Sequence, residues 1–316
     1  MRILIMGGTR FVGVALTQNL ISLGHEVVLF NRGNRPAPAA GVKMIQGDRK
    51  DIQQLKEKLS GQSFDAIFDN SGRELSDTKP IVDMFRDRIR HFIYMSSAGV
   101  YQESETLPYF EEDPTNPESR HKGKLHTEAY LKKLYSAEGF PFTSIRPTYI
   151  YGPGNYNDVE AWFFDRIVRD RPVPIPGNGQ FITQLGHVED LAAAMAAVLK
   201  QPKTYGEIYN ISDIRYVTYS GIAKLCAQAI GKDPDKLQFV YYNPKDFDFG
   251  KKKAFPFRLQ HFFTAIDKAL LDLDWEPEFD LVEGLETSFK QDYVPSGRHE
   301  QEIDFAIDDQ IIAAAG

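Results

Sequence analysis

The feature that most constrains this chain is a glycine-rich turn between a short apolar run and a helical pattern, close to the first residue. Residues 2–6 form the apolar run, the turn spans residues 7–13, and residues 10–23 repeat at helical spacing up to Gly24. Glycines in such a turn let the backbone approach a pyrophosphate, and the helix start offers N–H donors and a favourable dipole. The order strand, turn, helix therefore predicts a dinucleotide-binding turn, with a purely structural turn as the alternative.

Strand and helix patterns alternate through the first half of the chain. Further strands are expected at residues 26–30, 42–45, 65–68, 91–95 and 142–145, and helices at residues 53–59, 81–87 and 123–138. Alternation of this kind predicts an α/β fold, in which a doubly wound parallel sheet carries helices on both faces, as in a Rossmann domain.

The composition changes from Pro147 onward to proline, glycine and aromatic residues, which suits an irregular second lobe. We expect a Rossmann dinucleotide-binding domain over residues 1–148 and 187–212. A smaller C-terminal lobe, for substrate or RNA, is expected over residues 149–186 and 213–294. Residues 295–316 are polar and weakly patterned, and we expect them to form a loosely held C-terminal tail.

The composition also excludes several classes of protein. Of the 316 residues, 42% are hydrophobic and 26% are charged, which is the balance of a globular chain and not of a disordered one. The net charge of −7 argues against a globally basic nucleic-acid binder, but a local basic face is compatible with it. Cys226 is the single cysteine, no apolar run approaches ~18 residues, and the first strand starts at residue 2. We therefore expect a cytoplasmic protein without a membrane span or leader peptide.

Several stretches resemble a known superfamily. GGTRFVG (7–13), FIYMSSAGVY (92–101), SIRPTYIYGPG (144–154), LGHVEDLA (185–192) and LDWEPEFDLVEGL (273–285) together resemble the extended or atypical short-chain dehydrogenases/reductases. The resemblance to their NAD-dependent epimerase and dehydratase members covers nearly the whole chain. ESRHKGKLHTE (118–128) and NPKDFDFGKKKAFPFR (243–258) resemble the chloroplast stem-loop-binding proteins and their cyanobacterial relatives, a branch associated with RNA binding and endoribonuclease activity.

The resemblance indicates which residues would contact a cofactor. Arg10 stands where the superfamily turn has its middle glycine, and Asn31-Arg32 stands where an NAD site usually has an acidic residue. Arg32 either pairs with the 2′-phosphate of NADP or is a solvated turn residue. Asp48 either bonds adenine or caps a helix. For an NAD(P) that binds weakly or not at all, the predicted cofactor-binding residues are Gly7, Gly8, Thr9, Arg10, Phe11, Val12, Gly13, Asn31, Arg32, Asp48 and Arg49.

The superfamily's chemistry needs a serine, a tyrosine and a lysine four residues after the tyrosine. The tyrosine phenolate acts as base, and the lysine on the same helix face lowers the pKa of its hydroxyl. Ser97 and Lys124 match the serine and the lysine, but Arg120 stands at the tyrosine position and cannot act as a base. His121 either substitutes as the base or is a solvated surface residue. The predicted catalytic set is therefore a remnant or rearranged site of Ser97, Lys124 and His121.

Basic and aromatic residues interleave over residues 245–258. Cations that pair with phosphate, beside rings that stack on unpaired bases, are typical of single-stranded nucleic-acid recognition. The alternative is a loop whose phenylalanines belong to the core and whose lysines are solvated. With the family resemblance, we expect RNA binding by Lys251, Lys252, Lys253, Phe255, Phe257 and Arg258.

The resemblance implies an RNA-binding protein on a short-chain dehydrogenase/reductase scaffold without the catalytic tyrosine, with endoribonuclease activity as its extension. The expected partners are single-stranded or stem-loop RNA and ribonucleoproteins, and a mature plastid form would lie in the stroma. A divalent metal would assist cleavage. One acidic stretch either holds this metal or is a charged loop; it contains Glu103, Glu105, Glu111, Glu112 and Asp113. The alternative function is an NAD(P)-dependent nucleotide-sugar epimerase, dehydratase or reductase with a rearranged base.

Overall fold

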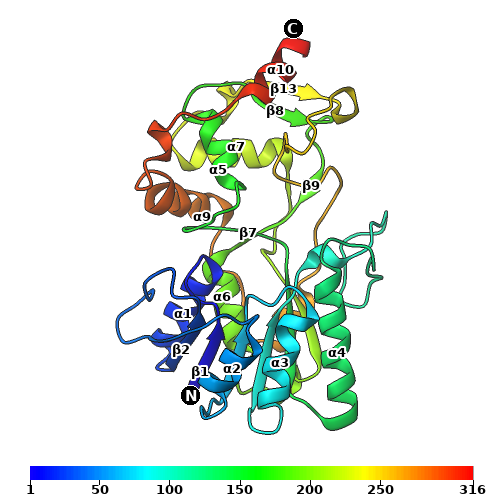
Figure 1. Cartoon of the computed structure of the whole chain (residues 1–316). Helices are drawn as coiled ribbons and strands as arrows, with labels where there is room; N and C mark the ends of the chain where they lie inside the picture. The colour runs from blue at the N-terminus through cyan, green and yellow to red at the C-terminus, as the bar shows by residue number, and fades with distance from the viewer. Residues whose placement is uncertain (316) are drawn as a thin grey trace. The chain divides into compact units, whose positions relative to one another are not determined.

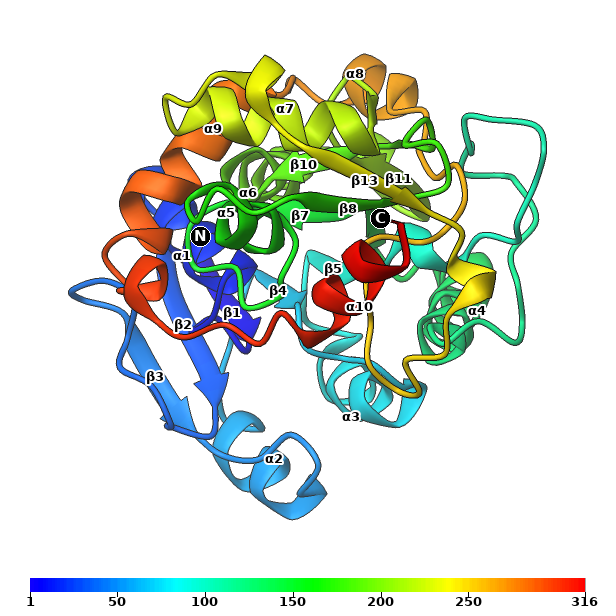
Figure 2. The same cartoon turned by 90° about the horizontal axis from the view of Figure 1, so that it is seen from above.

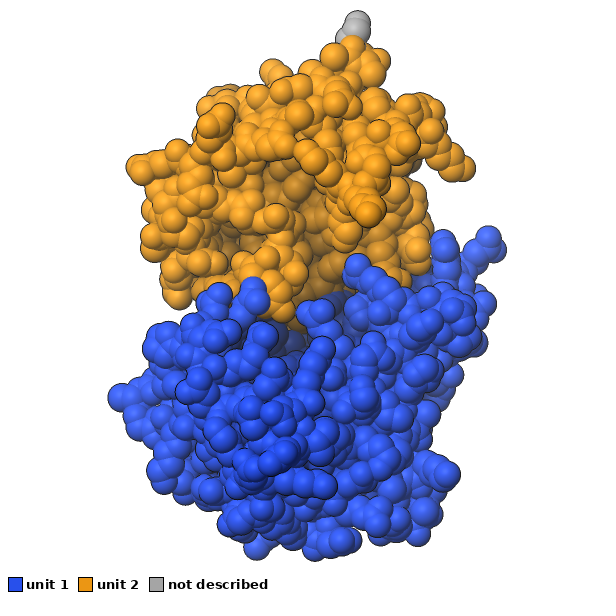
Figure 3. All heavy atoms as spheres, in the orientation of Figure 1, with its two compact units in different colours: residues 1–148, 188–212, 264–276 blue, residues 149–187, 213–263, 277–316 orange. Residues whose placement is uncertain are grey.

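A computed structural model describes residues 1–315, which divide into two compact units (Figure 3). Unit 1 contains Met1–Thr148, Val188–Ser212 and Thr264–Glu276. Unit 2 contains Tyr149–His187, Asp213–Phe263 and the residues from Pro277 onward. The sequence did not indicate that Thr264–Glu276 returns to unit 1.

Unit 1 is built on a seven-stranded sheet in which all neighbouring strands are parallel. Its strand order is β11-β6-β5-β4-β1-β2-β3. Successive strands are added on one side of β1 up to β3 and then on its other side from β4 onward, so the strand order reverses between β1 and β4. In such sheets, ligands bind beyond the carboxyl ends of the strands at the point of reversal. The strands are β1 (Arg2–Met6), β2 (Glu26–Asn31), β3 (Lys43–Gln46), β4 (Ala66–Asp69), β5 (His91–Met95), β6 (Phe142–Pro147) and β11 (Glu207–Ile211).

Helices cover both faces of this sheet. On one face, α1 (Val12–Ser22) packs against α6 (Val188–Ala197), and on the other lie α2 (Ile52–Leu59), α3 (Leu75–Phe85) and α4 (Lys122–Glu138) (Figures 1 and 2). The strands between them are mostly buried, as expected for parallel strands that are covered on both faces, except the edge strand β3, which is largely exposed. The fold class predicted from the sequence is confirmed. The short helix α8 (Asp267–Asp272) packs beside β11, and 3₁₀ turns span Ala98–Val100 and Pro202–Thr204.

Unit 2 contains three two-stranded pairings around an aromatic core. β7 (Tyr149–Tyr151) pairs with β10 (Leu185–His187), β8 (Val173–Pro176) with β13 (Phe239–Tyr242), and β9 (Ile182–Thr183) with β12 (Val217–Thr218). Its helices are α5 (Glu160–Ile167), α7 (Tyr219–Ala229), α9 (Leu281–Ser288), which continues as a π-helical turn over Phe289–Tyr293, and α10 (Ala306–Ala315). Further 3₁₀ turns span Pro234–Lys236, Pro244–Asp246 and Arg298–Glu300.

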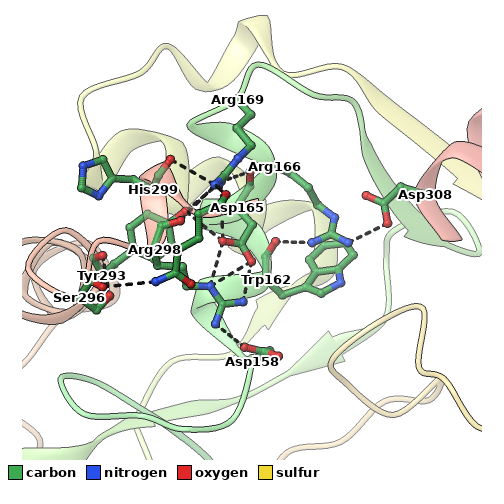
Figure 4. Close-up of polar contacts among 11 residues, drawn as sticks. Asp158, Trp162, Asp165, Arg166, Arg169, Tyr293, Ser296, Arg298, His299 and Asp308 are labelled. Carbon is green, nitrogen blue, oxygen red and sulfur yellow. Dashed lines mark hydrogen bonds and ion pairs between the residues drawn. The ribbon is translucent and has the colours of Figure 1, made fainter. Parts of the chain in front are cut away.

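The C-terminal residues are not the loosely held tail that the sequence predicted. Arg166 of α5 forms a buried ion pair with Asp308 of α10 at 2.7 Å, and Arg298 pairs with Asp165 at 2.6 Å (Figure 4). The Arg169 guanidinium donates to backbone carbonyls of the same segment, those of Arg298, His299 and Gln301. Although many residues of this segment are exposed, these ion pairs and backbone bonds attach it to the rest of unit 2.

Candidate functional site

The glycine-rich turn directly follows β1, at the point where the strand order reverses, and its backbone is closely packed. Gly7 and Gly8 have φ values of 111° and 95°, which favour glycine, and the Gly7 N–H donates to the Phe30 carbonyl of β2 at 2.9 Å. A Cβ on Gly13 would lie 2.6 Å from the Gly8 Cα. Gly13 therefore lets the start of α1 pack directly on the turn, as in glycine-rich turns that hold the pyrophosphate of a dinucleotide at a helix N-terminus. The Arg10 side chain is exposed.

The residues predicted to contact the adenosine half have local roles as well. The Asn31 Oδ1 accepts from the Gly33 N–H at 2.8 Å, and the Asp48 Oδ1 accepts from the Lys50 N–H at 2.9 Å. Each of these bonds closes a short turn at the carboxyl edge of the sheet. Arg32 is exposed beside Asn31, where its guanidinium is accessible to a 2′-phosphate. These positions therefore remain predictions for cofactor contact.

Arg49, one of the predicted cofactor-binding residues, forms an ion pair in the structure, and its contact with a cofactor stays a prediction. Its guanidinium donates to both oxygens of the fully buried Asp69 carboxylate, at 2.6 and 2.8 Å, and also to the Ser71 hydroxyl at 2.7 Å. Burial alone would raise the pKa of Asp69, but the Arg49 charge and the hydrogen bonds hold it below its usual value. Arg49 therefore neutralises a buried carboxylate at the end of β4, and we assign it to this ion pair.

Two partners of the Asp69 carboxylate were missed by the sequence reasoning. The Thr78 hydroxyl donates to the carboxylate at 2.7 Å, and the Gly72 N–H donates to it at 2.9 Å. Asp69 itself was a signal, because an acidic residue that ends a buried strand needs a buried cation and hydrogen-bond donors. Ser71 adds a bond to the Met6 carbonyl of β1 at 2.9 Å, so the ends of β1 and β4 are joined at the reversal.

Ser97 and Lys124 both lie at the carboxyl end of β5. The Ser97 Oγ accepts from the Gly99 N–H at 3.1 Å and caps a 3₁₀ turn. The Lys124 ammonium, in the first turn of α4, donates to the Met95 carbonyl and, at 3.4 Å, to the Gly72 carbonyl. Burial lowers its pKa to about 8. The lysine therefore bonds to backbone at the strand end where the superfamily has its active site.

Among residues 1–315, no tyrosine stands one helical turn before Lys124, where the catalytic arrangement needs it. Arg120 is exposed and precedes α4, whose N-cap is His121, so residue 120 does not share a helix face with Lys124. The Arg120 Nε donates to the His121 Nε2 at 3.0 Å, which occupies a nitrogen that a base would need. The ring centroid of Tyr94 lies 5.3 Å from the Lys124 Nζ, but the Tyr94 hydroxyl donates to the Gly72 carbonyl. Burial raises the pKa of this hydroxyl. The base role of His121 stays a prediction.

The predicted RNA-binding residues divide into an exposed and a buried group. Lys251, Lys252 and Lys253 are exposed, whereas Phe255 and Phe257 are 4% and 6% exposed and belong to the core of unit 2. The stacking role predicted for these two rings is therefore corrected, because a ring packed in the core cannot take a base. They pack against core aromatic residues, among them Tyr149, Trp162, Phe163 and Tyr219.

Arg258 is the last of the predicted RNA-binding residues. The Arg258 guanidinium stacks on the Phe262 ring at 4.6 Å.

Glu111, from the acidic stretch, is buried and accepts from the Asn210 N–H at 2.8 Å. Within residues 1–315, no group of three or more histidine, cysteine, aspartate or glutamate residues is placed to hold a metal ion. In the same residues, no helix has both the length and the apolarity needed to cross a membrane.

Comparison with known proteins agrees with this fold. The profile of the NAD dependent epimerase/dehydratase family matches residues 3–212. The chain is 48% identical to the chloroplast stem-loop binding protein of 41 kDa b from Arabidopsis thaliana, over 99% of this chain and 84% of that protein. It is 24% identical to a UDP-glucose 4-epimerase from Corynebacterium glutamicum, over 88% of this chain and 91% of the relative.

Solved structures share the fold at lower identity. A UDP-glucose 4-epimerase with UDP-glucose from Thermotoga maritima superposes with a TM-score of 0.78 and 22% identity, covering 94% of this chain and 99% of that one. A UDP-glucose 4-epimerase from Thermus thermophilus, in complex with NAD, gives a TM-score of 0.74 and 19% identity, covering 92% and 98%. The chain therefore belongs to the NAD-dependent epimerase/dehydratase family, with a short-chain dehydrogenase/reductase fold, and is a relative of a chloroplast stem-loop binding protein.

Proposed function

We propose that this protein binds RNA with unpaired nucleotides, as single strands or stem-loops, and does not carry out the tyrosine-dependent chemistry of its family. The observation that carries the proposal is the position of Arg120, which takes the place of the base and lies outside α4. The 48% identity to a stem-loop binding protein over nearly the whole chain supports RNA as the partner. The exposed lysines at residues 251–253 supply a local positive charge on an acidic chain.

Dinucleotide binding is a second part of the proposal. The turn over residues 7–13 would hold the pyrophosphate of NAD(P), and Arg32 would favour the 2′-phosphate of NADP. A bound nicotinamide supplies a hydride acceptor, but without a base near Lys124 no substrate hydroxyl would lose its proton. We therefore propose weak binding in a structural or regulatory role.

RNA cleavage is an extension of the same proposal. A divalent cation would assist cleavage, and because RNA phosphates themselves help to bind such an ion, the protein need not hold it alone. We propose that the protein acts in the cytoplasm or in the plastid stroma, the latter by analogy with its chloroplastic relative. Ribonucleoprotein particles are the expected assemblies.

The alternative function is an epimerase, dehydratase or reductase of nucleotide sugars with a rearranged base. The closed turn at residues 7–13 and the retained Ser97 and Lys124 favour it. In that case His121 would have to release the Arg120 guanidinium before it could accept a proton.

One preparation of the protein tests the two functions side by side. RNA binding is measured by fluorescence anisotropy on a stem-loop and on its blunt duplex, and cleavage is followed with and without Mg²⁺. Nucleotide-sugar turnover is measured on the same sample with NAD and with NADP. We expect stem-loop binding and no turnover; turnover that Lys124→Ala abolishes, without RNA binding, would establish the alternative instead.

A further inference from the structure

Two phenylalanines of the basic stretch lie outside the core and are stacked on each other. The rings of Phe247 and Phe249 have centroids 5.4 Å apart and an interplanar angle of 13°. The ring of Tyr242, the last residue of β13, meets Phe247 edge-on at 5.8 Å. Both phenylalanines are half-buried, and neither belongs to the unit 2 core that contains Phe255. The stretch therefore presents a pair of flat apolar rings at the surface.

The loop that carries these rings is held by its own hydrogen bonds. The Asn243 Oδ1 accepts from the Lys245 N–H at 3.2 Å, and the Asp248 Oδ1 accepts from the Gly250 N–H at 2.9 Å. The Lys252 N–H donates to the Phe249 carbonyl at 3.2 Å, which closes the turn behind the rings. A ligand that stacks on the rings would therefore meet a loop whose turns are already formed.

The charge around the rings is positive and partly unneutralised. Residues 245–253 contain four lysines and two aspartates, a net charge of 4 − 2 = +2 on a chain of net charge −7. Lys252 forms an exposed ion pair with Asp304 at 3.1 Å. Lys251 and Lys253 are exposed and form no ion pair with the described residues. The two lysines that flank Lys252 are therefore available to an anionic partner.

Building on the proposed RNA-binding function, we propose that Phe247 and Phe249 form the stacking platform for an unpaired base, while Lys251 and Lys253 bind the adjacent phosphates. A flat ring pair with nearby cations matches a nucleotide, which joins a flat base to an anionic phosphate. A duplex hides the faces of its bases in the helical stack. The platform therefore selects loop or single-stranded nucleotides over the stem.

The test compares RNA ligands and matched variants of the full-length protein. The probes are a labelled hairpin with an unpaired uridine loop and the blunt duplex of the same stem. We expect Phe249→Ala to weaken hairpin binding roughly 5- to 150-fold with little change in its salt dependence, and to leave duplex binding unchanged. The double variant Lys251→Ala/Lys253→Ala should flatten the log–log salt slope by about 1.4, whereas Lys252→Ala should change it less.

Two controls separate the possible outcomes. Phe249→Leu keeps apolar bulk without a flat ring, so it should lose hairpin affinity while its melting temperature stays at the wild-type value. If the wild type binds neither RNA, the proposed function fails. If it binds the hairpin while folded Phe249→Ala and Phe249→Leu keep wild-type affinity, only the stacking platform is overturned. Anionic phospholipid vesicles that bind more tightly than the hairpin, through the same rings, would also overturn it in favour of a membrane surface.

Discussion

Arg49 and Asp69 form a two-pronged ion pair at the carboxyl edge of the sheet, with N–O distances of 2.6 and 2.8 Å. The two residues follow β3 and end β4, strands that β2 and β1 separate in the sheet. The pair therefore spans the edge where a Rossmann fold receives its dinucleotide. A cofactor in this protein would meet a neutralised ion pair there, and not a free arginine.

Removing the charge of Asp69 should destabilise the protein strongly. Asp69→Asn leaves the buried Arg49 guanidinium without its counter-charge, which typically costs 3–5 kcal/mol of unfolding free energy. Urea denaturation measures this loss. The matched control is Asp83→Asn, which breaks an exposed pair with Lys79 and should cost less than about 1 kcal/mol. Equal losses in the two variants would contradict the structural role of the pair.

A side chain at residue 13 should disrupt both the turn and the cofactor site. The Cβ of Gly13→Ala would lie 2.6 Å from the Gly8 Cα, so backbone must move, at a cost of about 1–3 kcal/mol. Calorimetric titration with NADP and with NAD should show lost binding. Gly61→Ala is the control, because a Cβ there meets no atom within 4 Å. Binding that survives in Gly13→Ala would place the dinucleotide elsewhere.

Restoring the missing tyrosine should not restore catalysis. In Arg120→Tyr the phenol would still precede the N-cap of α4, so it would not share a helix face with Lys124. Assays with nucleotide sugars and NAD(P) should show no turnover. Activity that appears in Arg120→Tyr and vanishes when Lys124→Ala is added would show that this segment rearranges into helix.

The two aromatic groups of the basic stretch should respond differently to substitution. Phe255→Ala removes a core ring that packs on Trp162 and Tyr219, and should cost about 3–5 kcal/mol of stability without changing RNA affinity in the folded fraction. Phe249→Ala should change RNA affinity and leave the melting temperature nearly unchanged. The opposite pattern in the two variants would return base stacking to Phe255.

Glu160 should make unit 2 less stable as the pH rises. Burial raises the pKa of this carboxyl to about 7, despite hydrogen bonds from Gly152, Asn155 and Ser288. Between about pH 4.5 and 7 the unfolded chain has released a proton that the folded protein keeps, so the unfolding free energy falls with rising pH and then levels off. The total fall is on the order of 3 kcal/mol.

Glu160→Gln tests this dependence, because it removes the titrating group. Chemical denaturation at several pH values should show that the difference between wild type and variant changes across this interval. Glu286→Gln, which breaks an exposed pair with Lys290, is the control and should leave the pH dependence unchanged. A constant difference between wild type and Glu160→Gln would mean that Glu160 stays ionised when buried.

Local patterns were sufficient to predict six of the seven strands in the sheet of unit 1, but not the edge strand β11. Strand β1 begins and ends where the apolar run does, because a strand covered on both faces is continuously apolar. Helix α3 shows where a local rule fails. The sequence predicted a helix over residues 81–87, but the helix begins at Leu75, where Glu74 and Asp77 form a capping box, and it contains Pro80. The capped start outweighs the hydrogen bond that Pro80 removes.

The site was less predictable, because it depends on contacts between distant residues. Arg49 and Asp69 are 20 residues apart, and only the strand order brings them together. The interleaved phenylalanines of residues 247–257 look alike in sequence, yet two lie in the core and two at the surface. Spacing alone cannot separate them, since the segment is irregular and has no helical or strand period.

The ion pair between Arg166 and Asp308 has a consequence for biosynthesis. The partners are 142 residues apart, and Arg169 likewise finds its carbonyl partners about 130 residues later. Chains fold domain by domain as they leave the ribosome, at roughly 5–20 residues per second. The contacts of Arg166 and Arg169 therefore form only after residues 298–308 have been synthesised, on the order of ten seconds after the two arginines themselves.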